Sequence, residues 1–273
     1  MSDKPKLLST VNPWNQVSQG YATVAMPYFQ EYAAHALSLI EINPTSHVLD
    51  VACGPGTLSL LAAKKVSSVQ AIDFSPAMLA FLEEKLTKDG ITNVEWACED
   101  GQALSLANNR FDVAFSLFGL MFFPDRIKGL AEIFRTLKAG GGLVISSWAP
   151  VRSSSGMQAI FGALQAIKPD IPDPQEDLES LENPEFFKKE LESSGFIGVK
   201  ITPLTKQMTY PNVGDYWSEM VKANAILVMI KNSVSETEWE EKSKVALEFL
   251  QKEYGDTEVT FETTAWFGQG TKP

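Results

Sequence analysis

Strand and helix patterns alternate between residues 47 and 148, and this alternation limits the fold more than any other feature of the chain. Short apolar, β-branched runs predict strands, and helix-forming segments lie between them. Such alternation is typical of a parallel sheet with helices on both faces, and the nearly all-apolar central strands indicate that both faces are covered. The predicted strands are 47–52, 69–74, 93–98, 111–118 and 142–148. The predicted helices between them are 57–66, 75–90 and 125–141.

The rhythm changes on both sides of this core. A helical pattern precedes it through residue 41, with predicted interruptions near Gly20 and Pro27. After residue 150 the apolar spacing predicts several helices and two strand-rich segments, joined in part by an acidic, proline-rich connector at 168–180 that we expect to be an exposed loop. The predicted helices are 156–168, 184–194, 213–230 and 235–254, and the strand-rich segments are 196–210 and 258–270.

The charge balance makes nucleic acid an unfavourable partner. The 273 residues carry a formal net charge of −11, and an acidic surface repels phosphate backbones and anionic membranes. Two cysteines, Cys53 and Cys98, imply no disulfide framework. The first ten residues lack the apolar core of a signal peptide, and the apolar stretch 224–230 is too short to cross a bilayer. We therefore expect a cytoplasmic protein with no stable membrane insertion.

The stretch VLDVACGPGTLSLLAA, residues 48–63, places two glycines directly between a predicted strand and a predicted helix. In an open parallel sheet, ligands bind beyond the carboxyl ends of the strands. Gly54 and Gly56 would let the backbone approach a ligand closely there, and the amides that open the helix at Thr57 favour a negative group. The stretch therefore indicates a binding turn.

Asp73 ends the second predicted strand, where an acidic side chain can accept both ribose hydroxyls of a nucleoside. Its alternative role is to cap the next helix, but Ser75 is placed to do so. A dinucleotide site favours the pattern G-x-G-x-x-G, and here Ser59 occupies the third glycine position. These residues indicate a nucleoside cofactor and leave its identity open.

The order of several sequence blocks resembles the class I S-adenosylmethionine-dependent methyltransferases, in particular the branch similar to the ubiquinone and menaquinone biosynthesis methyltransferases. The resemblance covers about residues 46–149. Two departures are Ala52, where the first glycine of the turn is expected, and Ala139, where proline is common. The blocks are VLDVACGPGT (48–57), AIDFSPAML (71–79), EDGQAL (99–104), FDVAFSLFGLMFFPD (111–125) and RTLKAGGGLVISSW (135–148).

The resemblance implies a cofactor site built from the strand ends and the N-terminal segment. Residues expected at the methionine part are Asp50, Ala52, Cys53, Gly54 and Gly56. Residues expected at the ribose and adenine are Asp73, Phe74, Met78, Asp100, Gly101 and Gln102. Residues expected near the methyl group are Ser116, Leu117 and Met121, with Trp14 and Tyr21 closing over the cofactor.

The same resemblance implies a Rossmann-like, doubly wound α/β fold with a mostly parallel seven-stranded sheet whose last strand is antiparallel. We expect a single domain over 1–273, with a helical cap at 1–45, a cofactor-binding core at 46–150 and substrate-side helices and the last strands at 151–273. The implied cofactor is S-adenosyl-L-methionine. The apolar stretches 116–123 and 216–230 bring few charged groups to the predicted pocket, which favours a small, partly apolar or aromatic acceptor.

Methyl transfer of this kind is an in-line displacement that depends mainly on positioning. It needs no metal, and the sequence assigns no catalytic residue. His35 is either a general base or a helix histidine without a catalytic role, and His47 is expected to be structural. An NAD-dependent oxidoreductase and a non-catalytic cofactor-binding module remain the alternative functions.

Overall fold

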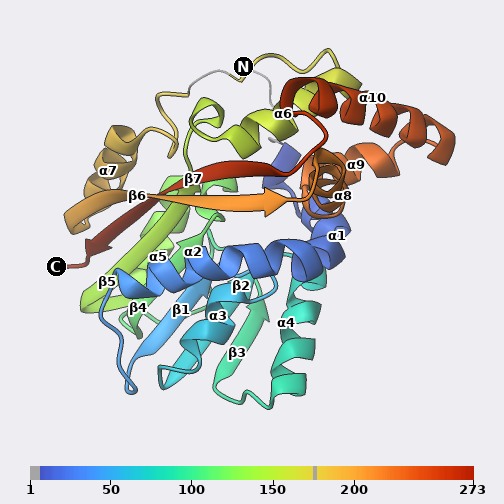
Figure 1. The fold of residues 1–273 in the computed structure, drawn as a ribbon. Helices are drawn as coiled ribbons and strands as arrows, with labels where there is room; N and C mark the ends of the chain where they lie inside the picture. Colours follow the sequence, from blue (N-terminus) through green and yellow to red (C-terminus); the bar gives the residue numbers. More distant parts are fainter. Residues whose placement is uncertain (1–6, 175–176) are drawn as a thin grey trace.

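A seven-stranded sheet runs through the computed structural model, which describes residues 7–174 and 177–273 (Figure 1). The strand order is β3-β2-β1-β4-β5-β7-β6. The strands β1 to β5 pair in parallel, and β7 is antiparallel to both of its neighbours. This confirms the doubly wound, Rossmann-like sheet with an antiparallel last strand. The strands are β1 (His47–Val51), β2 (Ser68–Asp73), β3 (Val94–Cys98), β4 (Phe111–Leu117), β5 (Leu137–Trp148), β6 (Ile197–Tyr210) and β7 (Val259–Thr271).

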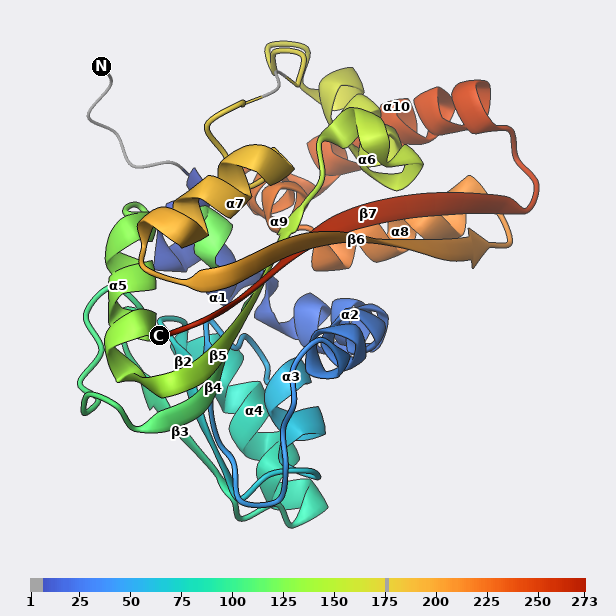
Figure 2. The same ribbon diagram turned by 90° about the vertical axis from the view of Figure 1, so that its left-hand side faces the viewer.

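Helices cover both faces of the sheet, and each face has its own buried apolar cluster (Figure 2). One cluster joins the sheet to α2, α3 and α4, and the other joins it to α5 and α7. The central strands are therefore apolar on both sides, as their sequence predicts. The helices of these two layers are α2 (Met26–Ser38), α3 (Thr57–Ala62), α4 (Pro76–Asp89), α5 (Arg126–Thr136) and α7 (Pro184–Ser193).

Four helices that follow β5 in the chain lie beyond the carboxyl ends of the parallel strands (Figure 1). Their buried side chains form a third apolar cluster. The long strands β6 and β7 extend past the rest of the sheet and pair along Leu204–Tyr210, so their far ends carry this cluster. The helices are α6 (Ser155–Ile167), α8 (Val213–Ala223), α9 (Ala225–Asn232) and α10 (Glu236–Tyr254), and α1 (Val11–Gly20) packs against α8 and α9.

Local signals explain most element boundaries. Ser75 caps α4 by accepting the amide of Met78, and Gly90 ends the helix in the left-handed region. Asn224 ends α8, and its side chain accepts two amides of α9. For this reason the predicted helix 213–230 is two helices.

Two sequence predictions need correction. The predicted helix 125–141 ends at Thr136, because Leu137 already pairs with Phe111 in the sheet and the Gly140 amide bonds to the Lys272 carbonyl. The predicted breaks near Gly20 and Pro27 are instead a change of helical pitch. A π-helical turn, Tyr21–Ala25, joins α1 to α2 without a gap.

Some expectations fall on positions 1–6 of the N-terminal segment and 175–176 of the connector, which lie outside the described residues. Within the described ranges, no helix is both long enough and apolar enough to cross a membrane.

Candidate functional site

Three cavities meet beyond the carboxyl ends of the parallel strands. The strand-end cavity has about 820 Å³ of space and is bordered by Gly54, Asp73 and Asp100, at the ends of β1, β2 and β3. The turn cavity lies over residues 50–58. The aromatic cavity has about 1120 Å³ of space, part of it open to solvent, and lies between the N-terminal helices and the appended helices. Tyr21 and Phe118 line all three cavities, so this pair marks where they join.

The turn after β1 places three residues in the left-handed region of backbone conformation. Its two glycines have different structural roles. Ala52, Gly54 and Gly56 have φ angles of 57°, 55° and 86°. A Cβ atom on Gly54 would meet no heavy atom of the protein within 4 Å, whereas a Cβ on Gly56 would lie 2.4 Å from the side chain of Leu82. Gly54 therefore faces open space, and Gly56 permits close packing of α3 against α4.

The Asp73 carboxylate joins two backbone turns. Its Oδ2 accepts the Gly54 amide and its Oδ1 accepts the Ser75 amide, both at 2.8 Å. Burial raises the pKa of Asp73 to about 6, although the backbone amides of Ser75, Gly54 and Phe74 oppose the shift. Asp73 therefore has a structural role that the sequence did not indicate, besides its place on the wall of the strand-end cavity.

Asp50 lies beneath the turn, with 1% of its surface exposed. Its Oδ2 accepts the Ser59 hydroxyl at 2.6 Å. Burial raises the pKa of Asp50 to about 7, against the effect of the Ser59 hydrogen bond, and nearby Asp73 adds to the rise. Burial also raises the pKa of the Cys53 thiol, so this cysteine is a packing residue rather than a thiolate nucleophile.

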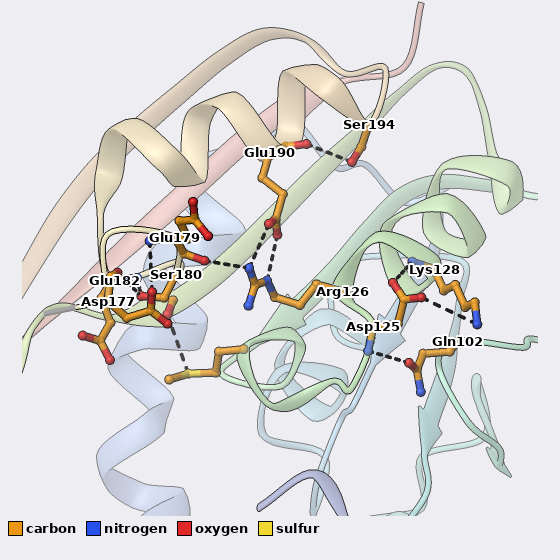
Figure 3. Close-up of polar contacts among 12 residues, drawn as sticks. Gln102, Asp125, Arg126, Lys128, Asp177, Glu179, Ser180, Glu182, Glu190 and Ser194 are labelled. Carbon is orange, nitrogen blue, oxygen red and sulfur yellow. Dashed lines mark hydrogen bonds and ion pairs between the residues drawn. The ribbon is translucent and has the colours of Figure 1, made fainter. Parts of the chain in front are cut away.

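On the far side of the strand-end cavity, a chain of polar contacts supports the loop after β3. The Asp100 carboxylate accepts both the backbone and side-chain amides of Gln102, and the Gln102 Oε1 accepts the Asp125 amide at 2.9 Å. The next residue, Arg126, contacts both carboxylate oxygens of Glu190, at 2.9 and 3.0 Å (Figure 3). This two-point ion pair fixes α5 to α7, and the contacts hold the loop in place.

Phe118 stands at the junction of the cavities in an unusual backbone conformation. Its φ of 55° is rare for an aromatic residue and marks a locally strained site. Its ring stacks on Trp148 with centroids 4.2 Å apart and contacts Phe29 at 5.1 Å. The sequence analysis did not select Phe118, because the strain and the stack arise only when segments far apart in the chain meet.

The aromatic cavity is assembled mainly from side chains on helices and on β6 and β7. Tyr28, Trp148, Tyr216 and Phe261 are among the aromatic residues on its wall, and Met157, Met208 and Met220 add flexible apolar surface. Of the described residues that line it, only Glu219 is charged. These residues come from five separate parts of the sequence, and apolar spacing alone could not distinguish them from ordinary core.

The N-terminal segment covers the cavities. The Asn15 side chain accepts the Ser75 hydroxyl at 2.7 Å, which ties α1 to the start of α4. Trp14 lies beside Phe122, with centroids 5.1 Å apart, and Tyr21 stacks on Phe29 at 5.4 Å. The π-helical turn directs Tyr21 toward the junction, and such turns are frequent at functional sites.

Most residues selected from the sequence line the strand-end or turn cavity. Three do not. Gly56 is packed against Leu82, Ser116 is fully buried with no partner for its hydroxyl, and Met121 packs on the opposite face of the sheet beside Ser147. Ser116 and Met121, which are expected near the methyl group, thus lie outside the walls of all three cavities. Those that line a cavity are Trp14, Tyr21, Asp50, Ala52, Cys53, Gly54, Asp73, Phe74, Met78, Asp100, Gly101, Gln102 and Leu117.

The two histidines lie away from the site. His35 packs edge-on against Phe267, with centroids 4.8 Å apart, and lines none of the three cavities. His47 is at the opposite end of β1, where its Nδ1 and the Ser68 hydroxyl lie 2.7 Å apart. In the described part of the chain, no group of three or more metal-ligating side chains comes together.

Residues 48–141 match the family model described as a methyltransferase domain. A demethylmenaquinone methyltransferase from Bacteroides fragilis is 35% identical over 126 residues, which are 45% of this chain and 51% of that protein. The chain thus spans about half the length of the curated relatives it matches.

Solved structures share the fold. The cyclase SpnF matches with a TM-score of 0.62 and 15% identity, over 100% of this chain and 98% of that chain. A phosphoethanolamine N-methyltransferase of Haemonchus contortus, solved with S-adenosylhomocysteine, matches with a TM-score of 0.56 and 18% identity, over 89% and 52% of the two chains. The segment that holds the glycine turn and the strand ends is thus similar to methyltransferase domains, and the solved structures show that the chain shares their fold.

Proposed function

We propose that the protein transfers a methyl group from S-adenosylmethionine to a small, partly apolar or aromatic molecule. The observation that supports this most strongly is the convergence of the strand-end cavity, the turn cavity and the aromatic cavity on Tyr21 and Phe118. A donor on one side and an acceptor on the other would meet at this pair.

The residues present fit the cofactor. The Asp73 carboxylate would accept the ribose hydroxyls, and Asp100 would accept from the adenine amino group beside Phe74 and Met78. The Gln102 backbone amide donates to Asp100 and so helps to hold this carboxylate in place. The open face of Gly54 would receive the methionine part, next to Asp50 in the turn cavity.

The bound cofactor supplies an activated methyl group on a positively charged sulfur. The protein's own contribution would be to align the acceptor, to exclude water with the rings of Tyr21, Phe118 and Trp148, and to present aromatic faces to a cationic centre. Positioning of this kind can lower a barrier by about 7–11 kcal/mol. No side chain needs to form a covalent intermediate.

Ser59 argues against the alternative of a dinucleotide-dependent oxidoreductase. A dinucleotide-binding turn uses a third glycine for close helix–strand packing. Here that position is a fully buried serine whose hydroxyl holds Asp50. Both cysteines are free, which suits a reducing compartment, and we propose the cytoplasm as the place of action.

The test combines binding with transfer. S-adenosylhomocysteine at 100 times its Kd should stabilise the protein by about 2.7 kcal/mol in thermal unfolding, and NAD should not. Incubation with methyl-labelled S-adenosylmethionine and a panel of apolar and aromatic acceptors should then move label to a panel member. Stabilisation by NAD alone would reverse the cofactor assignment, and binding without any label transfer would favour a non-catalytic module.

A further inference from the structure

One carboxylate is set into the wall of the aromatic cavity. Glu219 is the only charged side chain among the described residues that line it, and it lies on α8. The same cavity is lined by aromatic rings, including those of Tyr28, Tyr210, Tyr216 and Phe261. A purely apolar acceptor would gain nothing from a charged side chain at this position. Binding such an acceptor would bury the Glu219 carboxylate without a partner, which costs desolvation free energy.

The Tyr210 hydroxyl lies close to this carboxylate and donates to the Met208 sulfur at 3.7 Å. Burial raises the pKa of Tyr210, and the nearby negative charge of Glu219 raises it further. None of the ion pairs formed by the described residues includes Glu219. Because an ionised carboxylate has about four acceptor positions, Glu219 keeps capacity for a ligand.

An ammonium group suits this environment better than a neutral hydroxyl does. Both can donate a hydrogen bond to Glu219, but only the cation also gains the attraction of opposite charges and of the aromatic faces around it. The net charge of −11 adds a long-range attraction for cations. We propose that the acceptor is an apolar or aromatic molecule that carries one ammonium group, and that Glu219 pairs with this group.

This inference rests on the proposed function, because it describes the acceptor of the same reaction. Glu219 does not line the strand-end or turn cavity, whereas Trp14, Tyr21, Phe118 and Phe122 line both the aromatic and the strand-end cavity. Glu219 is therefore a specificity-determining residue that selects and orients the acceptor. It is not placed to remove a proton at the point of transfer.

The experiment compares naphthylethylamine with naphthylethanol, which differ only in the ammonium or hydroxyl group. Both are titrated calorimetrically into the protein saturated with S-adenosylhomocysteine. We expect the wild type to bind the amine at least about tenfold more tightly, since hydrogen bonds to charged groups are worth that much or more. Glu219→Gln should bind the two compounds almost equally. The control Glu84→Gln, an exposed position on α4, should keep the wild-type preference.

Equal binding of the two compounds by the wild type, or no binding of the amine, overturns the proposal without any variant. A tenfold amine preference that survives in Glu219→Gln also overturns it. The S-adenosylhomocysteine titration on the same samples separates the two claims. If the wild type does not bind that compound, the proposed function fails, and if it binds without an amine preference, only the role of Glu219 fails.

Discussion

The strand-end and turn cavities are bordered by backbone turns at the ends of the strands, whereas the aromatic cavity is formed mainly by side chains. Asp73 holds the turn after β1 and the turn after β2 together through two amides. By contrast, Phe118 and Trp148, which follow β4 and end β5, contribute a wall of stacked aromatic side chains. A cofactor common to a family can be bound by a fixed backbone, and an acceptor that differs between proteins requires a wall that sequence change can reshape.

Replacing Asp73 should have the largest effect on stability and on cofactor affinity. Asp73→Ala leaves the Gly54 and Ser75 amides without an acceptor, so we expect a loss of about 2–4 kcal/mol in the free energy of unfolding. The affinity for S-adenosylhomocysteine should fall about 10- to 100-fold, because the ribose acceptor is lost as well. Calorimetry and thermal unfolding measure the two effects.

Asp73→Asn is the matched variant, because it keeps one oxygen acceptor and should give intermediate values in both measurements. An unchanged Kd in Asp73→Ala, together with lost stability, would mean that Asp73 serves the fold alone.

Two substitutions test the different roles of Gly54 and Gly56 within the turn after β1. Gly56→Ala should destabilise the fold by about 1–3 kcal/mol, because its Cβ would strike Leu82 at a positive φ. Its cofactor affinity should stay near that of the wild type. Gly54→Ala meets no protein atom, so its stability cost should be only about 1 kcal/mol, from the left-handed backbone.

The Gly54→Ala methyl group faces the cavities, and S-adenosylhomocysteine should bind about tenfold more weakly. Urea unfolding and calorimetry of both variants provide the comparison. If Gly56→Ala weakens binding more than Gly54→Ala does, the assignment of the two glycines is reversed.

Cofactor affinity should depend on pH through Asp73. Its pKa in the free protein is raised to about 6, chiefly by burial. Ribose hydroxyls donate to the ionised carboxylate, so binding favours the charged form. Affinity should be constant above this pKa and fall by up to about tenfold per pH unit below it.

Titrations with S-adenosylhomocysteine between about pH 5 and 8 measure this dependence. Asp73→Asn should lose most of it. Any part that remains reports on Asp50, whose pKa burial raises to about 7. A wild-type affinity that rises toward low pH would show that the ligand prefers the protonated carboxyl group.

The smallest effect should come from the contact between the N-terminal cap and the core. Asn15→Ala removes the acceptor of the Ser75 hydroxyl, which can still cap α4 through its oxygen. We expect about a threefold loss of cofactor affinity and less than about 1 kcal/mol of stability. Gln16→Ala, which removes a contact of α1 with Asn232, is the control. Equal losses in the two variants would mean that the link to Ser75 has no particular importance.

The sequence predicted the elements around the strand-end and turn cavities well, because the signals for these elements are local. The strand, the glycine turn and the Ser75 cap are all contained within segments of about ten residues. The features that the sequence did not predict depend on contacts between different segments of the chain. The amides that bind Asp73 come from two different turns, and the helix expected through residue 141 ends early because Leu137 pairs with β4.

The sequence contains no comparable local signal for the aromatic cavity. Phe118 and Glu219 lie about a hundred positions apart in the chain and share a cavity only after β5, β7 and α8 are in place. Met121 is a further example, because the turn Leu120–Phe122 after β4 packs its side chain into the cluster that joins the sheet to α5 and α7.

A crystal structure of the protein with S-adenosylhomocysteine is the most direct test of whether the cofactor binds at the strand ends and the acceptor in the aromatic cavity. We expect the ribose to contact the Asp73 carboxylate, the homocysteine part to lie along the turn at Gly54, and the sulfur to face the junction of Tyr21 and Phe118. The aromatic cavity should remain free for the acceptor. A ligand bound inside the aromatic cavity, or a ribose with no contact to Asp73, would contradict this expectation.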